Sequence, residues 1–325
     1  MKSIWKKLSE TGPIFALAPM HDVTDSAFRS IVAICGKPDI FFTEFIAIDG
    51  LTNPKGKKKI EKYYLTYSQE EKPIIAQIWG SNLKNIKESA KIIAGLGFDG
   101  IDINMGCPDK RVIKSGGGAG LINNPKLMKE LVLACKDGSN GLPVSVKTRI
   151  GFDEISIEKW LPTLLEAKLD ALTIHARTKK ELSKVPPHWD IVKKISSLVR
   201  KEGTVFIGNG DIKSYDDGLL KIKDNNLDGV MIGRGALGNP WIFNQSINFN
   251  DISIEDKINL MIKHAKIFEK SYKDIKKFPH VKKHLHAYIQ GFEGAKKLRS
   301  QIMSAKDSLE IEKVSLDWLE TIKIK

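Results

Sequence analysis

The stretch TVFIGNGDIKSYDDGLLKIKDNNLDGVMIGRGAL, residues 204 to 237, contains two short apolar runs separated by a helix-like segment. The runs over 204–212 and 229–237 are bounded by turn-forming residues, which predicts two strands. Residues 214–226 between them have helical periodicity, which predicts a helix. A strand, a helix and a second strand in this order form the unit that joins parallel strands of one sheet.

The same alternation extends over most of the chain. Strand-like segments lie at 14–20, 39–45, 73–80, 100–107, 143–150, 171–178, 204–212 and 229–237. Helical periodicity lies between most of them, at 24–35, 82–95, 125–137, 156–168, 188–202 and 214–226. The strands start about 31 residues apart, the length of one βα unit. This pattern predicts an α/β fold, a TIM (β/α)8 barrel, with a doubly wound open sheet as the alternative.

The pattern changes after the eighth predicted strand. From residue 251 onward only helical periodicity appears, and Ser253 with Asp256 three residues later resembles a helix-capping box. We therefore expect two domains, a barrel over residues 1–245 and an all-helical domain over residues 246–325.

The excess positive charge is concentrated in the predicted helical domain. The 325 residues include 52 Lys and Arg against 39 Asp and Glu, and residues 257–299 alone contain twelve Lys and Arg against three Asp and Glu. Such a cluster favours contact with a polyanion such as RNA, although a solvated helix face would also carry lysines. The candidate RNA-binding residues here are Lys282, Lys283, Lys296, Lys297 and Arg299.

Composition excludes several classes of protein. The three cysteines, Cys35, Cys107 and Cys135, are too few and too scattered for a disulfide framework, and no zinc-ligand spacing occurs, so we predict no metal. No apolar run is long enough to cross a bilayer, and the opening MKSIWKKLSE lacks the apolar core of a secretory signal. We expect a cytoplasmic protein without a membrane segment.

Polar side chains follow the predicted strands at the barrel's carboxyl end. They are His21 and Asp22 after the first strand, beside Pro19 and Met20, then Gln77, Asn104, Cys107, Lys147, Arg149, His175, Arg177, Asn209 and Asp211 at or after later ones. Each has a structural reading by itself, because a lone histidine such as His175 is more often a satisfied core residue than a catalyst. Together at one rim, where barrels bind ligands, they predict a binding site.

Two glycine loops follow the last two strands. GNGD (208–211) includes Gly210, and IGRGALGNP (232–240) includes Gly233 and Arg234. Barrels commonly bind phosphate at these positions through loop N–H groups, and an arginine adds charge. The loops predict a phosphorylated cofactor, whose ring Lys147, Gln77 and Asn209 could contact.

Several motifs in this order resemble the tRNA-dihydrouridine synthase family. They include LAPMHDVTDSAFR, AQIWG, DINMGCPDKRVIKSGGGAGL, VSVKTRIGFD, TIHART, GNGDI and GRGALGNPWIF, all between residues 14 and 243. The later segment KKHLHAYIQGFEGAKKLR resembles that family's helical tRNA-binding tail. The resemblance implies an enzyme that holds FMN in a TIM barrel, uses NADPH or NADH as reductant and reduces the C5=C6 bond of specific uridines in tRNA.

The resemblance also implies roles for individual residues. FMN would lie beside Pro19, Met20 and His21, with its pyrimidine edge on Gln77 and Lys147 and its ribityl phosphate on Asn209, Gly210, Asp211, Gly233 and Arg234. His175 would lie close to both the flavin and the uracil, and Asn104 would help to hold the base. After hydride transfer to C6, Cys107 would protonate C5, because a thiol with an ordinary pKa of about 8.5 is mostly protonated at neutral pH.

Other segments carry further expectations. We assign RNA contact to Lys110 and Arg111, on a loop after the fourth strand that could close over the base, and to Arg177. The lysine-rich segment 53–64 is either a solvated loop or a second RNA contact, and the loop over 179–189 departs from the family's pattern. The alternative functions are an FMN barrel that acts on a free pyrimidine, as dihydroorotate dehydrogenases do, and a non-catalytic RNA-binding protein. We expect a monomer with no obligate protein partner.

Overall fold

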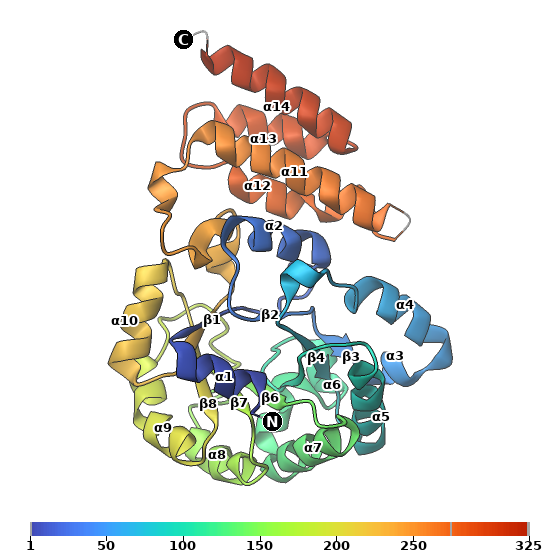
Figure 1. Ribbon diagram of the computed structural model, residues 1–325, viewed down its shortest axis with the longest axis vertical. Helices are drawn as coiled ribbons and strands as arrows, with labels where there is room; N and C mark the ends of the chain where they lie inside the picture. Colours follow the sequence, from blue (N-terminus) through green and yellow to red (C-terminus); the bar gives the residue numbers. More distant parts are fainter. Residues whose placement is uncertain (1, 274, 324–325) are drawn as a thin grey trace.

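The computed structural model describes residues 2–273 and 275–323, and its centre is a parallel barrel (Figure 1). The strands are β1 (Ile14–Leu17), β2 (Phe41–Phe42), β3 (Ile46–Ala47), β4 (Ile74–Trp79), β5 (Gly100–Asn104), β6 (Val144–Arg149), β7 (Ala171–His175), β8 (Val205–Asn209) and β9 (Gly229–Ile232). They pair in the order β1-β9-β8-β7-β6-β5-β4-β2, and β3 also pairs with β4.

The two ends of this order meet, so the sheet is closed. Ala16 of β1 forms a parallel bridge with Ile40, directly before β2, while β1 also pairs with β9. The short strands β2 and β3 both lie beside β4 and together fill one barrel position. The TIM barrel is therefore confirmed, and the doubly wound open sheet is wrong, because an open sheet would leave β1 without this second neighbour.

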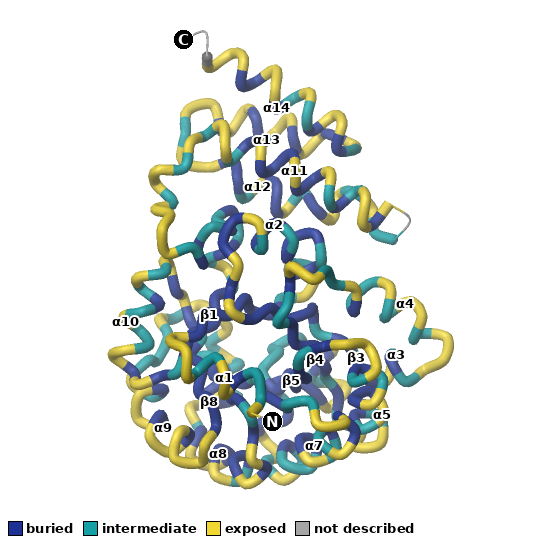
Figure 2. The backbone as a smooth tube through the Cα atoms, viewed as in Figure 1, coloured by how far each residue is buried: buried dark blue, intermediate teal, exposed yellow. Residues whose placement is uncertain are grey.

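The helices predicted between the strands are present. They are α2 (Ser26–Gly36), α5 (Leu83–Ala94), α7 (Pro125–Gly138), α8 (Ile157–Leu165), α9 (Trp189–Lys201) and α10 (Tyr215–Asn225). Side chains of Asp25, Asn82, Asn124 and Ser214 cap the first turns of four of them by accepting backbone N–H groups. Figure 2 shows the buried strands inside a ring of helices whose outer faces are exposed.

Four helices in the barrel half were not predicted. They are α1 (Ile4–Thr11), α3 (Ile48–Thr52), α4 (Pro54–Tyr64) and α6 (Lys110–Lys114). The helix α4 replaces the solvated loop that the lysine-rich segment 53–64 suggested. Its start follows ordinary rules, since Pro54 occupies the first turn and the Asn53 side chain accepts the Lys55 N–H.

The last part of the chain is helical, as predicted. It contains α11 (Ile254–Tyr272), α12 (Lys282–Tyr288), α13 (Ala295–Ser304) and α14 (Ser308–Lys323), at the top of Figure 1. Ser253 caps α11 by accepting the Asp256 N–H at 3.0 Å. Over the part of the chain that the structure covers, none of the helices combines the length and apolar character that a bilayer span requires.

The helical domain packs on α2 of the barrel. Ala27, Ile31 and Cys35 of α2 are buried in one apolar cluster with residues of α11 to α14. The Tyr272 hydroxyl at the end of α11 also accepts the Ser26 N–H at 3.1 Å. The predicted boundary between residues 245 and 246 stays a prediction, and the contact surface lies on α2.

Candidate active site

A cavity of about 450 Å³, here called the first cavity, opens at the carboxyl ends of the strands. Much of its lining consists of residues predicted to bind the cofactor, namely Pro19, Met20, Lys147, His175, Asn209, Gly210, Asp211, Gly233 and Arg234. Arg149, which ends a predicted strand, also lines it, as do Leu182 and Ser183, to which the sequence assigned no role. Among the described residues, the predicted His21 and Gln77 are not part of this lining.

One end of the first cavity is formed by the two glycine loops. A Cβ atom at Gly210 would lie 2.9 Å from the Cβ of Pro187, so only glycine fits there. The next residue, Asp211, has a φ of 46°, a left-handed conformation that is unusual for a residue with a side chain. Its carboxylate accepts hydrogen bonds from Arg177 and, at 2.5 Å, from Arg234. The bond from Arg177 is the main cause of the lowered pKa of Asp211.

The position of Arg177 corrects its predicted role as an RNA contact. Its side chain is buried, and its guanidinium pairs with Asp211 and donates to the Val185 carbonyl at 2.6 Å. A buried guanidinium with these partners does not face an RNA strand outside the protein. Arg177 instead holds Asp211 and the loop that contains Val185.

Hydrogen-bond donors lie beside the glycine loops. Lys147 Nζ donates to Asn209 Oδ1 at 3.1 Å, and Asn209 Nδ2 donates to the Met231 carbonyl at 2.7 Å. Burial, and next the charge of Arg149, lowers the pKa of Lys147 to about 8. Burial and the same arginine lower the pKa of His175 well below its usual value, so its imidazole is neutral at pH 7. An anionic ligand edge in this cavity would favour the charged form of Lys147.

A buried hydrogen-bond chain lies beneath the cavity. Gln77 Nε2 donates to Asp102 Oδ2 at 2.7 Å, and Gln77 Oε1 accepts from Asn104 Nδ2 at 2.9 Å. Asn104 Oδ1 in turn accepts the N–H groups of Gly106 and Cys107 at 3.1 and 2.9 Å. Gln77 and Asn104 thus support the segment that carries Cys107, whereas the sequence predicted direct contacts with the ring and the base.

Cys107 is half-buried and is not among the described residues that line the first cavity, whereas the next residue, Pro108, is. Burial is the main cause of the raised pKa of its thiol, which is therefore protonated at neutral pH. Its carbonyl accepts the Ala119 N–H at 3.0 Å, and a Cβ at Gly118 would lie 2.7 Å from that carbonyl oxygen. Hydrogen bonds on both sides therefore hold the thiol in place.

Arg149 joins two loops around the cavity. Its Nε donates to the Gly106 carbonyl at 2.8 Å, and its Nη1 donates to the carbonyls of Thr178 and Leu182 at 3.0 and 3.3 Å. The second loop is the one that departs from the family's pattern, and Glu181 organises it by accepting from the Thr178 N–H. The position of Arg149 at the end of a predicted strand was a signal in the sequence, but no sequence pattern identified the carbonyl groups to which it donates.

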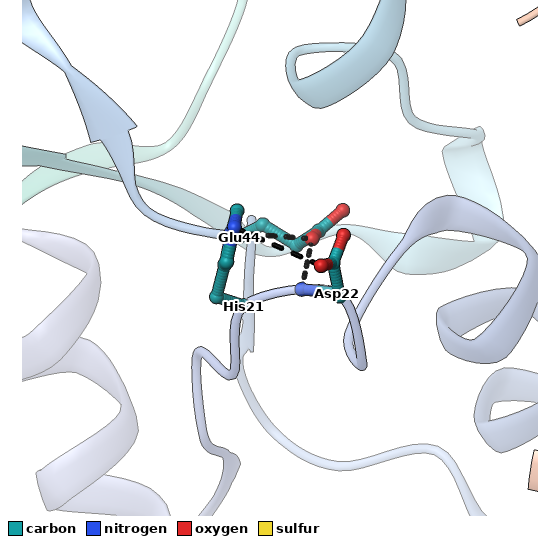
Figure 3. Close-up of side chains that lie close together, drawn as sticks. All are labelled: His21, Asp22 and Glu44. Carbon is teal, nitrogen blue, oxygen red and sulfur yellow. Dashed lines mark hydrogen bonds and ion pairs between the residues drawn. The ribbon is translucent and has the colours of Figure 1, made fainter. Parts of the chain in front are cut away.

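His21 faces a second cavity of about 360 Å³. Figure 3 shows its ring beside the carboxylates of Asp22 and Glu44, and the Asp22 N–H donates to Glu44 Oε1 at 2.5 Å. These three side chains have the ligand types of a metal site. However, Nζ of Lys276 lies 3.4 Å from Glu44 Oε2 and 3.8 Å from Asp25 Oδ2, so an ammonium from the helical domain already supplies the positive charge.

The remaining predicted RNA-binding residues are at the surface, with one exception. Lys110 and Arg111 on α6, and Lys283, Lys296 and Lys297 in the helical domain, are exposed, while Arg299 is half-buried. Lys282 is half-buried, and its Nζ donates to the Met303 carbonyl at 2.6 Å near the end of α13. That bond occupies the Lys282 ammonium within the protein.

The sequence comparisons with known proteins agree with one another. A sequence model described as dihydrouridine synthase (Dus) matches residues 16–323. A probable tRNA-dihydrouridine synthase of Staphylococcus aureus is 40% identical over 314 residues, which cover 95% of this chain and 93% of that protein. Probable tRNA-dihydrouridine synthase 2 of Bacillus subtilis is 38% identical over 322 residues, covering 98% and 97%. The solved structure of morphinone reductase in complex with tetrahydroNAD has a TM-score of 0.47 at 12% identity, covering 70% of this chain and 84% of that one.

Proposed function

This chain belongs to the dihydrouridine synthase family, and on that premise we propose that it reduces the C5=C6 bond of specific uridines in tRNA to give 5,6-dihydrouridine. The observation that carries the proposal is the position of Cys107, half-buried and directly before Pro108 in the wall of a cavity rich in hydrogen-bond donors, where burial raises the pKa of its thiol. Such a thiol can give a proton to carbon, whereas a carboxylate would already be ionised at neutral pH.

The first cavity fits FMN. The glycine loops with Gly210 and Gly233, together with the Arg234 guanidinium, would hold the phosphate, and Lys147 and Asn209 would face the polar edge of the ring. Pro19 and Met20 supply another part of the wall, and a Cβ atom at Gly233 would lie 3.3 Å from Met20 Sδ. When bound, FMN would supply a hydride for the uracil C6, with electrons that come from NADPH or NADH.

The protein's own groups would complete the reduction. Hydride addition at C6 places negative charge on C5 and the C4 carbonyl, and Cys107 would deliver the proton that C5 needs. The neutral imidazole of His175 and the ammonium of Lys147 would stabilise negative charge on the carbonyl groups of the uracil and the flavin through hydrogen bonds. Asn104 would keep the thiol in position, because its Oδ1 accepts the Cys107 N–H.

The substrate must leave its base stack to reach such a cavity. Unstacking costs a few kcal/mol, so a protein that grips the folded RNA is required. The exposed cations Lys283, Lys296 and Lys297 of the helical domain would contact phosphates, as would Lys110 and Arg111 beside the active site. We further propose a cytoplasmic monomer, because a bound tRNA would cover these basic surfaces.

The direct test is to incubate the purified protein with NADPH and tRNA that lacks dihydrouridine, and to measure dihydrouridine by liquid chromatography with mass spectrometry. The expected result is dihydrouridine at one or a few positions, and a parallel reaction with NADH would show the preferred reductant. Turnover of free uracil, uridine or orotate without reduction of tRNA would support the free-pyrimidine alternative. RNA binding without bound flavin or turnover would support the non-catalytic alternative.

Replacing Arg234 with alanine should weaken FMN binding by roughly tenfold to a hundredfold. The substitution removes charged hydrogen bonds of about 1.5–3 kcal/mol and also leaves the Asp211 carboxylate next to the proposed phosphate. Equilibrium dialysis of the flavin would measure the effect. Lys201→Ala, on the exposed end of α9, is the control and should bind FMN normally. Equal affinity of the Arg234→Ala protein would mean that the phosphate binds elsewhere.

A further inference from the structure

The second cavity lies directly behind the wall of the first. Met20 and Pro108 line the first cavity, and their chain neighbours His21 and Asp109 line the second. Pro108 and Asp109 directly follow Cys107 in the chain. The second cavity is therefore adjacent to the place where the target uracil would react.

Aromatic rings dominate the second cavity. Its lining contains His21, Phe45, Tyr64 and Trp79, with Ile46, Ile60 and Val112 among the apolar residues. The rings of His21 and Tyr64 are nearly parallel, at 19° with centroids 6.3 Å apart, and the Phe45 ring is 5.2 Å from His21. Burial is the main cause of the raised pKa of Tyr64, about 12, so its phenol is uncharged at neutral pH. Partly exposed aromatic rings of this kind present faces on which a planar ring can stack.

The helix that forms one side of this cavity does not close it. Within the described residues 54–64, no side chain of α4 is buried, and only half-buried Ile60 and Tyr64, four residues apart on one face, line the cavity. If α4 served only to cover the barrel, its inner face would be expected to be buried in the core. The cavity remains open between α4 and α6.

Both helices beside the cavity are strongly basic. Residues 54–64 and 109–115 together contain eight Lys and Arg against two carboxylates. Arg111, which lines the cavity, has a side chain that is 88% exposed. Lys276 of the helical domain lies over the Tyr64 ring, with Nζ 5.8 Å from its centroid. Its side chain is only 8% exposed and is paired with Glu44, so the cations open to RNA are those of α4 and α6. A groove with cations on its rim and aromatic rings inside it is the combination that binds single-stranded nucleic acid.

We propose that the second cavity binds a nucleobase adjacent to the reduced uridine in the same RNA strand. The base would stack on Tyr64 and His21, and the basic residues of α4 and α6 would contact the flanking phosphates. This inference rests on the proposed function, since it assumes an RNA strand with one base in the first cavity. It assigns the lysine-rich segment 53–64 to substrate binding and gives His21 a role other than contact with the cofactor.

The first test compares substitutions at two neighbouring tyrosines. Tyr64→Ala should weaken tRNA binding by roughly tenfold to a hundredfold, since base–aromatic stacking has that magnitude, while Tyr64→Phe should bind tRNA almost normally. Tyr63→Ala is the matched control, because Tyr63 is on the same helix and lines neither cavity among the described residues. Filter binding gives the affinity for tRNA, and thermal unfolding shows that the variants are folded. Unchanged affinity in Tyr64→Ala would overturn the proposal.

The alternative occupant of this aromatic cavity is the nicotinamide ring of the reductant. The rate at which NADPH reduces the bound flavin, without tRNA, distinguishes the two. We expect that rate to be the same in Tyr64→Ala and in the wild-type protein. A large decrease in it, with tRNA affinity intact, would assign the cavity to NADPH and overturn the inference.

The second test removes the base instead of the side chain. The mapped dihydrouridine position identifies the two flanking nucleotides, and synthetic tRNA would carry an abasic nucleotide at one or the other. For one of them, loss of the base should weaken binding to the wild-type protein but cause no further loss in Tyr64→Ala. Additive losses at both positions would contradict the proposal while leaving uridine reduction intact. If instead no dihydrouridine forms at all, the proposed function fails, and the filter-binding comparison still reports on the cavity.

Discussion

Replacing Cys107 with alanine is expected to lower the rate of uridine reduction by about 10²- to 10⁴-fold, the range typical of a lost general acid. The reason is that no other described thiol lies at the first cavity, since Cys35 and Cys135 are buried in helices α2 and α7. The step to measure is oxidation of the pre-reduced flavin protein by tRNA in a stopped-flow instrument. Reduction of the bound flavin by NADPH should stay within about twofold of the wild-type rate, because it needs no proton from Cys107.

A control variant and a contradicting outcome make this experiment specific. Cys35→Ala removes a thiol far from the cavity and should leave both steps unchanged. If tRNA oxidises the flavin of Cys107→Ala as fast as that of the wild-type protein, then another group is the proton donor.

The same thiol predicts a pH dependence. Because burial raises the pKa of Cys107, the donor stays protonated through neutral pH and is lost only as the pH rises above the ordinary thiol value of about 8.5. The rate of flavin oxidation by tRNA should therefore be level between about pH 6 and 7 and fall at more alkaline pH, where Lys147, with a pKa of about 8, also loses its charge. A rate that increases with pH through this range would indicate a base in place of the proposed acid.

The second large effect is expected on stability, from Arg29→Met. Arg29 of α2 forms a buried ion pair with Glu71, and the two side chains are only 2% and 1% exposed. Its guanidinium also donates to the carbonyls of Thr24 and Thr66 at 2.8 and 2.7 Å. Methionine would leave a buried carboxylate without its cation, which costs about 3–5 kcal/mol of unfolding free energy. Urea unfolding at pH 7 would measure the loss.

A surface pair provides the control for this experiment. Lys159 and Glu154 lie 3.4 Å apart with side chains that are 75% and 78% exposed, so Lys159→Met should change stability by less than about 1 kcal/mol. The double variant Arg29→Met with Glu71→Met should recover part of the loss, because it no longer buries a lone charge. A cost below about 1 kcal/mol for Arg29→Met alone would show that Glu71 finds another partner or becomes protonated.

The sequence predicted the barrel well because its signals are local. The predicted helix over 125–137 corresponds to α7 at Pro125–Gly138, where Asn124 and Pro125 mark the start. The helix α4 was missed although Asn53 and Pro54 gave the same start signal; its residues are mostly polar, and none of the side chains described for it is buried. Local chemistry identified most of the helices between the strands, but it missed α1, which has a buried Trp5.

The roles of individual site residues were harder to predict because they depend on distant partners. Gln77 lies opposite Asp102 in the register of β4 and β5, and that pairing turns its amide into a link in a buried chain. Arg177 is buried because Asp211, on another strand end, accepts its guanidinium. The sequence indicates that a residue ends a strand, but the neighbouring strands decide whether its side chain enters the cavity or supports it.

The ammonium of Lys276 links the helical domain to the barrel, so the two domains cannot be separated without losing its contacts. Nζ of this lysine lies 3.4 Å from Glu44 Oε2, on the segment beside β3, and 3.9 Å from Asp22 Oδ1, on the loop that begins at the cavity wall. A barrel cut after residue 245 would lose this cation and expose the apolar outer face of α2. The tail is thus not an exchangeable module, and a chimera with another RNA-binding tail would fold well only if that tail also covered α2 and returned a positive charge to the same carboxylates.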